Sequence, residues 1–256
     1  MAARIDRDSG RYFLKDDVRM EVDFGRTPQN RGVPPPPMEK PCRVDAARTV
    51  LTAPGRWSGV SPVPVEQAIA RRESRRRFGH EPLTLDELSF LLWSTQGVRR
   101  SLGQGVTLRT VPSAGARHAF ETYVVALRVA GLDIGVYRYL PSEHEIVLEF
   151  ADPEADERII EAAHGQSFAG SAAAVFIWTA IPARMEWRYG DASYKVIAMD
   201  AGHVCQNLYL SCECIGAGTC AIAAYRQDLM DSFLRLDGVD EFAIDVAPVG
   251  RVPAGR

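Results

Sequence analysis

The most unusual stretch of the sequence is RRESRRRF, residues 71–78, in which five arginines and one glutamate surround Ser74. Arg72, Ser74 and Arg76 alternate along the chain, so in an extended segment their side chains point to the same side. Two guanidinium groups and a hydroxyl on one side form an array of hydrogen-bond donors that suits a flat anionic ligand. A solvated basic turn is the alternative interpretation of the same residues.

Three other stretches have compositions that suit contact with a ligand. TVPSAGARH, residues 110–118, predicts a tight loop whose backbone N–H groups can approach a ligand closely. GAGTCAIAAY, residues 216–225, predicts a loop of small residues after a long helix, and small side chains allow a planar ring to lie against the backbone. PVGRV, residues 248–252, places Arg251 after a strand, where it either lies at the surface or contacts a phosphate.

Several catalytic and metal-binding motifs are absent. The sequence contains no G-x-G-x-x-G, no P-loop and no G-x-S-x-G, so a Rossmann nucleotide domain and an α/β-hydrolase both lack support. The cysteines form no C-x-x-C pair and lack neighbours at zinc-ligand spacing, so we interpret them as buried thiols in a reducing compartment rather than as metal ligands. They are Cys42, Cys205, Cys212, Cys214 and Cys220.

The bulk composition narrows the class of protein. The chain has 256 residues, of which 46% are hydrophobic and 25% charged, as is ordinary for a globular protein. The net charge of -3 argues against a general nucleic-acid binder. No run of apolar residues is long enough to span a membrane, and the N-terminal MAARIDRDSG lacks the apolar core of a secretory signal, so we expect a cytoplasmic protein with no membrane partner.

Periodicity predicts the elements that hold these stretches. One helix is expected from Val65 into the arginine cluster, and another begins at Thr84, which forms a capping box with Glu87, and ends near Gly97. Strands are expected at 120–129, in the hairpin GVYRYLP and HEIVLEF, at 172–181 and in EFAIDVAPVGRV, and further helices at 154–164, 194–218 and 226–235. This mixed order predicts an α+β fold with helices around a mostly antiparallel sheet.

Two segments are predicted to lie outside that regular pattern. Residues 1–60 are predicted to form an extended arm, because RGVPPPPMEKP contains four consecutive prolines. Residues 61–256 are predicted to form the folded domain. The arm is expected to pack on the body or on a partner chain. IPARMEWRYGDASYK, residues 181–195, is predicted as a loop that carries aromatic and cationic side chains, either as a lid over a substrate or as a packing cluster.

In order and spacing, these stretches together resemble the nitroreductase superfamily of FMN enzymes, and specifically its SagB/ThcOx-type branch. The resemblance covers roughly residues 62–254 and is carried by RRESRRRF, PLTLDELSFLLWSTQGV, TVPSAGARHAFETY, GVYRYLPSEHEIVL, DAGHVCQNLYLSCECIGAGTCAIAAY and APVGRV. It implies a nitroreductase-like fold, an FMN cofactor and a homodimer, because the pocket of the family lies between two chains.

The resemblance also implies site residues. Arg72, Ser74 and Arg76 correspond to the element that contacts the flavin, and Arg251 to a phosphate-binding position. Backbone N–H groups of the loop from Ala221 to Ala224 would contact flavin N5. The loop at residues 112–115 would reach the flavin from the second subunit. The full implied cofactor-binding set is Arg72, Ser74, Arg76, Pro112, Ser113, Ala114, Gly115, Gln166, Ala221, Ile222, Ala223, Ala224, Gly250 and Arg251.

The sequence departs from the pattern of the family at two places. Glu73 stands where many members carry a basic residue, and Arg188–Tyr189 stands where some members that oxidise peptide azolines carry Lys–Tyr. An arginine is a poor general base because its pKa exceeds about 12. The candidates for proton transfer are therefore Tyr189, Tyr194 and Lys195. His118 and His203 are interpreted as core or helix-surface histidines, with a place at the border of the pocket as the alternative.

The resemblance implies an FMN-dependent oxidoreductase. NAD(P)H would reduce the flavin at N5, and a nitro compound, a quinone or a related small acceptor would then be reduced in a ping-pong cycle. One alternative is a SagB/ThcOx-type dehydrogenase that oxidises a peptide or a metabolite. Another is a flavin-binding protein without turnover. A nucleic-acid partner is not expected, because only Phe78 accompanies the arginine cluster as an aromatic platform.

Overall fold

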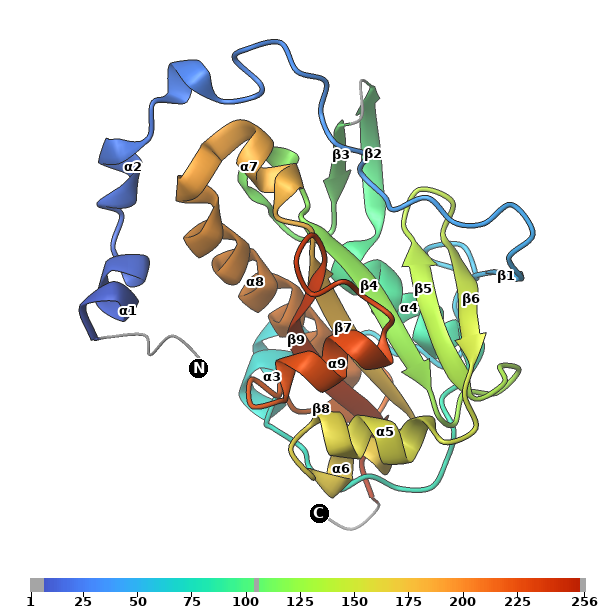
Figure 1. The fold of residues 1–256 in the computed structure, drawn as a ribbon. Helices are drawn as coiled ribbons and strands as arrows, with labels where there is room; N and C mark the ends of the chain where they lie inside the picture. Colours follow the sequence, from blue (N-terminus) through green and yellow to red (C-terminus); the bar gives the residue numbers. More distant parts are fainter. Residues whose placement is uncertain (1–6, 104–105, 254–256) are drawn as a thin grey trace.

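The computed structural model describes residues 7–103 and 106–253 and contains a seven-stranded sheet at its centre (Figure 1). The strand order is β1-β6-β5-β4-β7-β9-β8, and every pair of neighbouring strands is antiparallel. The α+β fold predicted from the sequence is therefore confirmed. The strands are β1 (Arg48–Val50), β4 (Phe120–Ala126), β5 (Gly135–Leu140), β6 (Glu145–Ala151), β7 (Ala174–Ala180), β8 (Ala217–Thr219) and β9 (Phe242–Arg251).

The middle of the sheet is apolar on both faces. All seven residues of β4 and all seven of β7 are buried, which explains why β7 reads as a continuous apolar run. Phe176 and Trp178 of β7 point to one face, and Val175 and Ile177 point to the other. The sheet thus separates two hydrophobic cores, each of which is covered by its own helices.

Helices cover both faces of the sheet. The first core lies under α4 (Leu85–Gln96) and α8 (Ser193–Glu213), and α3 (Val65–Arg71) packs against α8. The second core lies under α5 (Ala155–Ala162), α6 (Ser167–Gly170) and α9 (Gln227–Phe233). The capping box of α4 is present as predicted, with Thr84 and Glu87 bonded reciprocally. Within the described ranges, no helix is both long and apolar enough to cross a membrane.

Two elements differ from the sequence-based expectation. Strands β2 (Val98–Gly103) and β3 (Val106–Arg109) pair in a separate antiparallel hairpin, although their basic and glycine-containing sequence carries little strand signal. The predicted loop at 181–195 was wrong in its first half, because α7 (Ala183–Tyr189) is a helix. Pro182, with its fixed φ, precedes α7, and Glu186 N donates to the Pro182 carbonyl.

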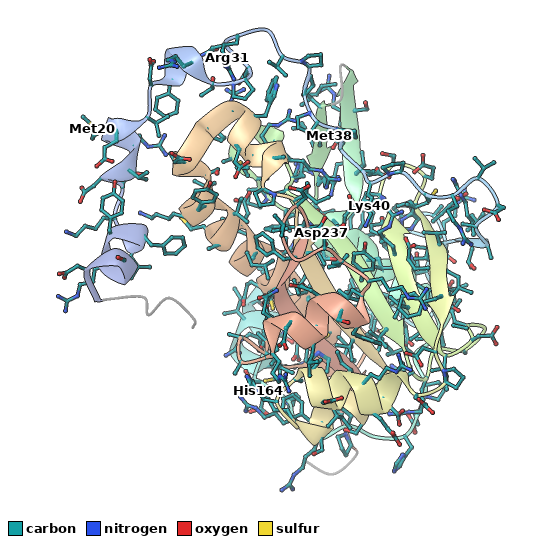
Figure 2. All side chains as sticks on the ribbon, in the orientation of Figure 1. Met20, Arg31, Met38, Lys40, His164 and Asp237 are labelled. Atoms are coloured by element: carbon teal, nitrogen blue, oxygen red, sulfur yellow. The ribbon has the colours of Figure 1, made fainter. Side chains whose placement is uncertain are left out.

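The arm before residue 60 is helical at first and then extended. It contains α1 (Arg7–Leu14), α2 (Val18–Glu21) and the 3-10 turn η1 (Phe24–Arg26). The two α-helices lie outside the body, α1 against α8 and α2 against the 3-10 turn η3 (Gly190–Ala192), and they leave Met20 88% exposed (Figures 1 and 2). The proline-rich part then lies on the surface of its own chain, where it makes the contacts described next.

Buried arginines hold the proline-rich segment by its backbone carbonyls. Arg184 Nε donates to the Pro37 carbonyl at 2.9 Å, and Arg138 Nη1 donates to the Lys40 carbonyl at 2.8 Å. Both arginine side chains are 1% exposed. Residues 37–40 of the arm are thus tied to the body through charge-assisted hydrogen bonds.

Both arginines pair with the buried carboxylate of Glu121, and Arg138 Nε also donates to the partly exposed Glu149 at 2.6 Å. Glu121 of β4 is 2% exposed, and its oxygens accept from Arg184 Nη2, from Arg138 Nη1 at 3.3 Å and from the Lys40 backbone N–H at 2.8 Å. The Glu121 cluster, formed by Glu121, Arg138, Arg184 and the Lys40 backbone, therefore joins β4, β5, α7 and the arm.

Replacement of Glu121 by glutamine should destabilise the fold strongly. The variant keeps the volume of the side chain but leaves the buried Arg184 without its counter-charge and Arg138 with only the partly exposed Glu149. Removal of one partner from a buried ion pair typically costs about 3–5 kcal/mol. Urea unfolding of the purified protein measures the effect. Glu154→Gln is the matched control, because that carboxylate is 71% exposed and its pairing with Arg158 contributes little. Equal stability of both variants would contradict the assigned role of Glu121.

Candidate functional site

The arginine cluster continues α3 as an extended segment along the edge of the sheet. Ser74 forms a parallel bridge with Thr219 of β8, and Arg75 N donates to the Thr219 carbonyl at 2.9 Å. A Cβ atom on Gly218 would collide with the Arg75 side chain, and one on Gly250 would lie 2.8 Å from Phe78 Cβ. Both glycines are therefore needed for the cluster to lie directly against the sheet.

The cluster lines an open, cationic pocket of about 570 Å³. Arg76 and Arg77 are exposed and find no acceptor among the described residues, whereas Arg75 pairs with Glu73 at 2.7 Å. Free guanidinium donors around an open pocket suit a phosphate or a comparable anion. The lining residues are Glu73, Ser74, Arg75, Arg76, Arg77 and Pro253.

Tyr209 of α8 connects the cluster to the small-residue loop and was not identified from the sequence. Its hydroxyl lies 3.0 Å from Ser74 Oγ and accepts a hydrogen bond from Ala221 N at 2.8 Å. The Arg72 guanidinium lies over its ring, 5.3 Å from the centroid. The helical pattern of the sequence marks Tyr209 only as a residue of the longest helix, because its partners lie in segments far from it in the chain.

The loop after β8 presents backbone donors beside Tyr209. Ile222 is 3% exposed and its N–H donates to the Val246 carbonyl at 2.7 Å, whereas Ala223 and Ala224 are exposed. The N–H groups of Ala223 and Ala224 donate to no acceptor in the described part of the chain. Gln166 Nε2 donates to the Ala224 carbonyl at 2.9 Å. The structure thus brings Gln166, the loop and Ser74 to one region, as the resemblance implied for a ligand site.

The Arg251 side chain forms hydrogen bonds with other residues of its own chain. Its guanidinium donates to Glu87 at 2.7 Å, to the Ile215 carbonyl at 2.7 Å and to the Pro82 carbonyl at 3.3 Å. Glu87 therefore serves both the capping box and this ion pair, a second role that the sequence does not reveal. The Nε–H and one Nη1–H of Arg251 donate to no described residue and are left for a ligand, so its role at a phosphate stays a prediction.

The loop at residues 112–115 lies away from the arginine pocket. Gly115 has φ +58°, a conformation that favours glycine, and a Cβ atom there would lie 2.8 Å from Arg188 Cδ and from Tyr189 Oη. The loop is therefore packed under the last turn of α7. None of residues 112–115 lines the pocket of the arginine cluster on the same chain.

The three candidates for proton transfer lie on the side of this loop. Tyr189 packs on Gly115, and Lys195 lines a groove of about 600 Å³ between the arm and α8 together with Pro112 and Ser113. The Tyr194 side chain is largely exposed; partial burial and the Glu186 carboxylate raise its pKa above the usual value. No contact in the described structure brings them to the arginine pocket of their own chain.

The two histidines occupy the positions expected from the sequence. His118 is 3% exposed, and its Nε2 lies 3.1 Å from the Thr107 carbonyl, which makes Nε2 the protonated nitrogen of the neutral ring. Burial, with a contribution from Arg109, lowers the pKa of His118 to about 3, so the ring is neutral at physiological pH. His203 is exposed on α8. His118 is thus a core histidine and His203 a helix-surface histidine. Each also lines a cavity, His118 one that it shares with Arg99 and Arg109 and His203 the groove between the arm and α8, but neither lines the arginine pocket.

Comparison with known proteins identifies relatives of this architecture. Residues 69–251 match the model of the nitroreductase family. A provisionally named nitroreductase of Methanocaldococcus jannaschii, MJ1384, is 35% identical over 192 residues, which cover 75% of this chain and 93% of that protein. The trifolitoxin-processing protein TfxB of Rhizobium leguminosarum is 30% identical over 192 residues, 68% of this chain but only 50% of the relative.

A solved structure extends the likeness to the fold. The crystal structure of a provisionally named nitroreductase from Ralstonia eutropha JMP134 superposes with a TM-score of 0.66 at 28% identity, and the match covers 87% of this chain and all of that one. The matched family segment contains the end of α3, the arginine cluster, the small-residue loop and β9. The chain belongs to the nitroreductase family.

Proposed function

We propose that the protein is an FMN-dependent oxidoreductase whose cofactor lies across the arginine cluster and the loop at residues 221–224. The observation that carries this proposal is the junction at Tyr209, which joins Arg72, Ser74 and Ala221. Next to it lie cationic donors and backbone N–H groups that have no partner among the described residues. A phosphate and a planar ring with acceptor atoms satisfy these two kinds of donor together.

Each part of the site has a separate task in this proposal. Arg76 and the free donors of Arg251 would hold the phosphate, while Arg72 and Ser74 would lie nearer the ring. The N–H groups of Ala223 and Ala224 would donate to the ring edge. FMN, when bound, supplies the hydride and electron transfer, and the cationic surroundings favour its negatively charged reduced form.

We further propose that the functional unit is a homodimer. The loop at residues 112–115 lines no part of the arginine pocket on its own chain, so a second copy is required if both contribute to one site. Apolar side chains suited to an interface are exposed on the arm and on α8. They include Phe13 (44%), Leu14 (67%), Met20 (88%) and Met199 (55%).

The proposed donor is NAD(P)H and the proposed acceptor is a nitro compound or a quinone, in a cytoplasmic setting. Tyr189, Tyr194 and Lys195, beside the loop at 112–115, are the proposed groups for any proton transfer to the acceptor. The similarity to the trifolitoxin-processing protein favours a second candidate, a dehydrogenase acting on a peptide. Arg188, in the position of the lysine of such enzymes, weighs against that candidate because a guanidinium does not act as a base at neutral pH.

The function is tested first by spectroscopy and turnover. The purified protein should be yellow or should take up added FMN, and it should oxidise NAD(P)H with a nitroarene or a quinone faster than free FMN does. A protein that binds FMN without turnover corresponds to the flavin-binding alternative. A colourless protein that takes up no FMN contradicts the whole proposal.

Replacement of either Arg72 or Arg76 by alanine should weaken FMN binding by about ten- to a hundred-fold, because each change removes a charge-assisted hydrogen bond. Titration of the flavin-free protein with FMN, followed by fluorescence quenching, measures the affinity. Arg71→Ala is the matched control, since Arg71 lies at the end of α3 and bonds only to Gln67 among the described residues. If both variants bind FMN as tightly as the unaltered protein, the cluster is a solvated basic turn and not a flavin site.

A truncation separates the two parts of the arm. A chain that begins at Gln29 lacks α1, α2 and η1 but keeps the segment held by Arg184 and Arg138. It should remain folded, dissociate to monomers at higher concentration than the full chain and release FMN more readily. A chain that begins at Ser61 should lose thermal stability as well. Light scattering measures the dimer fraction and absorbance measures the flavin content of both truncated chains. If the chain that begins at Gln29 is as dimeric and binds as much flavin as the full chain, the arm is not a dimer contact.

A further inference from the structure

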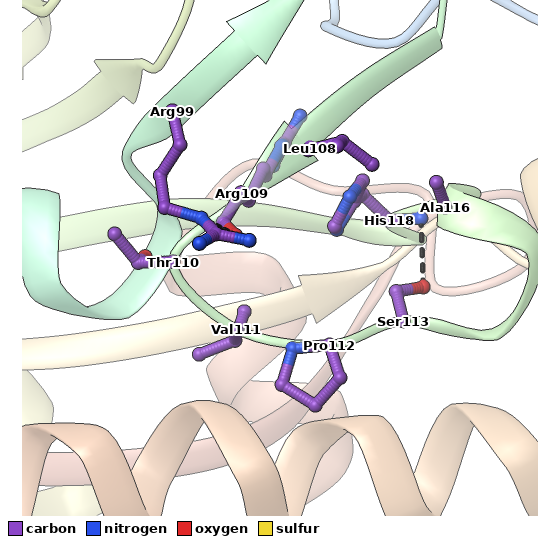
Figure 3. A pocket seen from close by; sticks show the side chains of 9 residues that line it. All are labelled: Arg99, Leu108, Arg109, Thr110, Val111, Pro112, Ser113, Ala116 and His118. Carbon is purple, nitrogen blue, oxygen red and sulfur yellow. Dashed lines mark hydrogen bonds between the residues drawn. The ribbon is translucent and has the colours of Figure 1, made fainter.

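A second pocket lies beneath the β2–β3 hairpin and is distinct from the pocket of the arginine cluster (Figure 3). Its volume is about 320 Å³, enough for a small ligand. None of its nine described lining residues is an aspartate or a glutamate. The lining residues are Arg99, Leu108, Arg109, Thr110, Val111, Pro112, Ser113, Ala116 and His118.

Arg99 is held in a fixed position at this hairpin pocket. Its Nε donates to the Arg109 carbonyl at 2.9 Å, so the guanidinium lies beside the backbone of β3 (Figure 3). The Nη groups of Arg99 make no hydrogen bond with any described residue. A guanidinium anchored through Nε with free Nη donors is preorganised to bind an anion, because little side-chain entropy is lost when the anion arrives.

Behind Arg99, the wall of the pocket carries positive charge that the protein leaves partly uncompensated. Arg109 is 3% exposed; it donates to Gln96 Oε1 at 2.8 Å and to the Met38 carbonyl at 3.2 Å, while its Nε has no partner in the described structure. Burial lowers the pKa of Arg109 to about 10, which still leaves it charged at neutral pH. The carboxylates of Glu121 and Glu39 favour the charged form of Arg109, but neither is hydrogen-bonded to it, and Glu121 pairs directly with Arg138 and Arg184.

The remaining lining is apolar or already bonded. Leu108, Val111 and Pro112 provide the apolar part of the pocket lining (Figure 3). Ser113 Oγ accepts from His118 N at 3.0 Å, and the His118 ring is neutral, as described above. An organic ligand with one anionic group therefore fits better than a bare cation, which would meet two arginines and no carboxylate among the described lining residues.

We propose that the hairpin pocket binds the carboxylate or phosphate group of an anionic substrate, with Arg99 as a specificity-determining residue. The inference rests on the proposed function for its place in the reaction: the pocket shares Pro112 and Ser113 with the loop that we propose to reach the flavin of the partner chain. An anionic substrate held there would have its apolar part directed along the loop toward the redox site.

The first experiment tests for a carboxylate and compares two electron acceptors of the same shape. 4-Nitrobenzoate is anionic and 4-nitrobenzamide is neutral. Arg99→Gln should raise the KM for 4-nitrobenzoate about ten-fold and leave the KM for 4-nitrobenzamide and the FMN content unchanged. Arg100→Gln is the matched control: it changes the net charge equally, lies on the same exposed strand and does not line the pocket.

The second experiment tests for a phosphate and compares the two electron donors, NADPH and NADH. NADPH carries one more phosphate than NADH, so Arg99→Gln should raise the KM for NADPH toward that for NADH if the pocket takes this phosphate. An effect confined to 4-nitrobenzoate assigns the pocket to a carboxylate, and one confined to NADPH assigns it to a phosphate. The inference would be overturned if the Arg99 and Arg100 variants changed the KM values equally, or if Arg99→Gln changed the KM in neither experiment.

Calorimetry separates this inference from the proposed function. Binding of 4-nitrobenzoate and of NADPH to the purified protein is measured directly, without turnover. If the protein turns over no acceptor, weaker binding of either probe to Arg99→Gln than to Arg100→Gln still supports the pocket as an anion site. Identical binding isotherms for the two variants reject it, whatever the result for turnover.

Discussion

A single buried carboxylate, that of Glu121, determines how distant parts of the chain meet. Burial of the two guanidinium groups of Arg138 and Arg184 would be prohibitively unfavourable without a counter-charge. Glu121 pairs with both guanidinium groups, Glu149 adds a second carboxylate on Arg138, and Glu121 also accepts from the backbone of the arm at Lys40. The arm, the hairpin of β5 and β6, and helix α7 are therefore positioned by one electrostatic requirement.

The consequences of this cluster extend to the candidate site through α7. Arg184 is anchored one turn before Arg188 and Tyr189, which pack on Gly115. Arg117 Nε also donates to the Arg184 carbonyl, which ties the end of the loop to the same helix. The loop proposed to serve the partner chain is thus supported by a rigid, charge-compensated core, and such support is what a precise binding site requires.

Charge is distributed unevenly over this slightly acidic protein. Its net charge is -3, yet Arg76 and Arg77 surround one pocket, and Arg99 and Arg109 line another. In each pocket some guanidinium donors lack an acceptor within the described ranges, whereas carboxylates such as Glu73 and Glu121 are engaged by other arginines. Local positive potential in a globally acidic chain attracts small anions to specific places without promoting general binding to nucleic acid.

The sequence by itself determined the local elements. The apolar run of β7, the capping box of α4 and the long helix α8 follow from patterns within each segment, because periodicity and capping depend on neighbours in the chain. The alternation of Arg72, Ser74 and Arg76 likewise marks one candidate site from residue types and spacing alone. The resemblance to a family added the fold and the expectation of a flavin cofactor, which no local pattern contains.

Only the tertiary structure decided which residues complete that site. Tyr209 is an ordinary helical aromatic until Ser74 and Ala221 lie beside it, and Glu87 is an ordinary cap until Arg251 reaches it. The β2–β3 hairpin and α7 do not follow from the sequence for the same reason. Arg109 of β3 and Arg184 of α7 bond to the arm, far away in the chain, and the free energy of such contacts is not encoded in the pattern of any single segment.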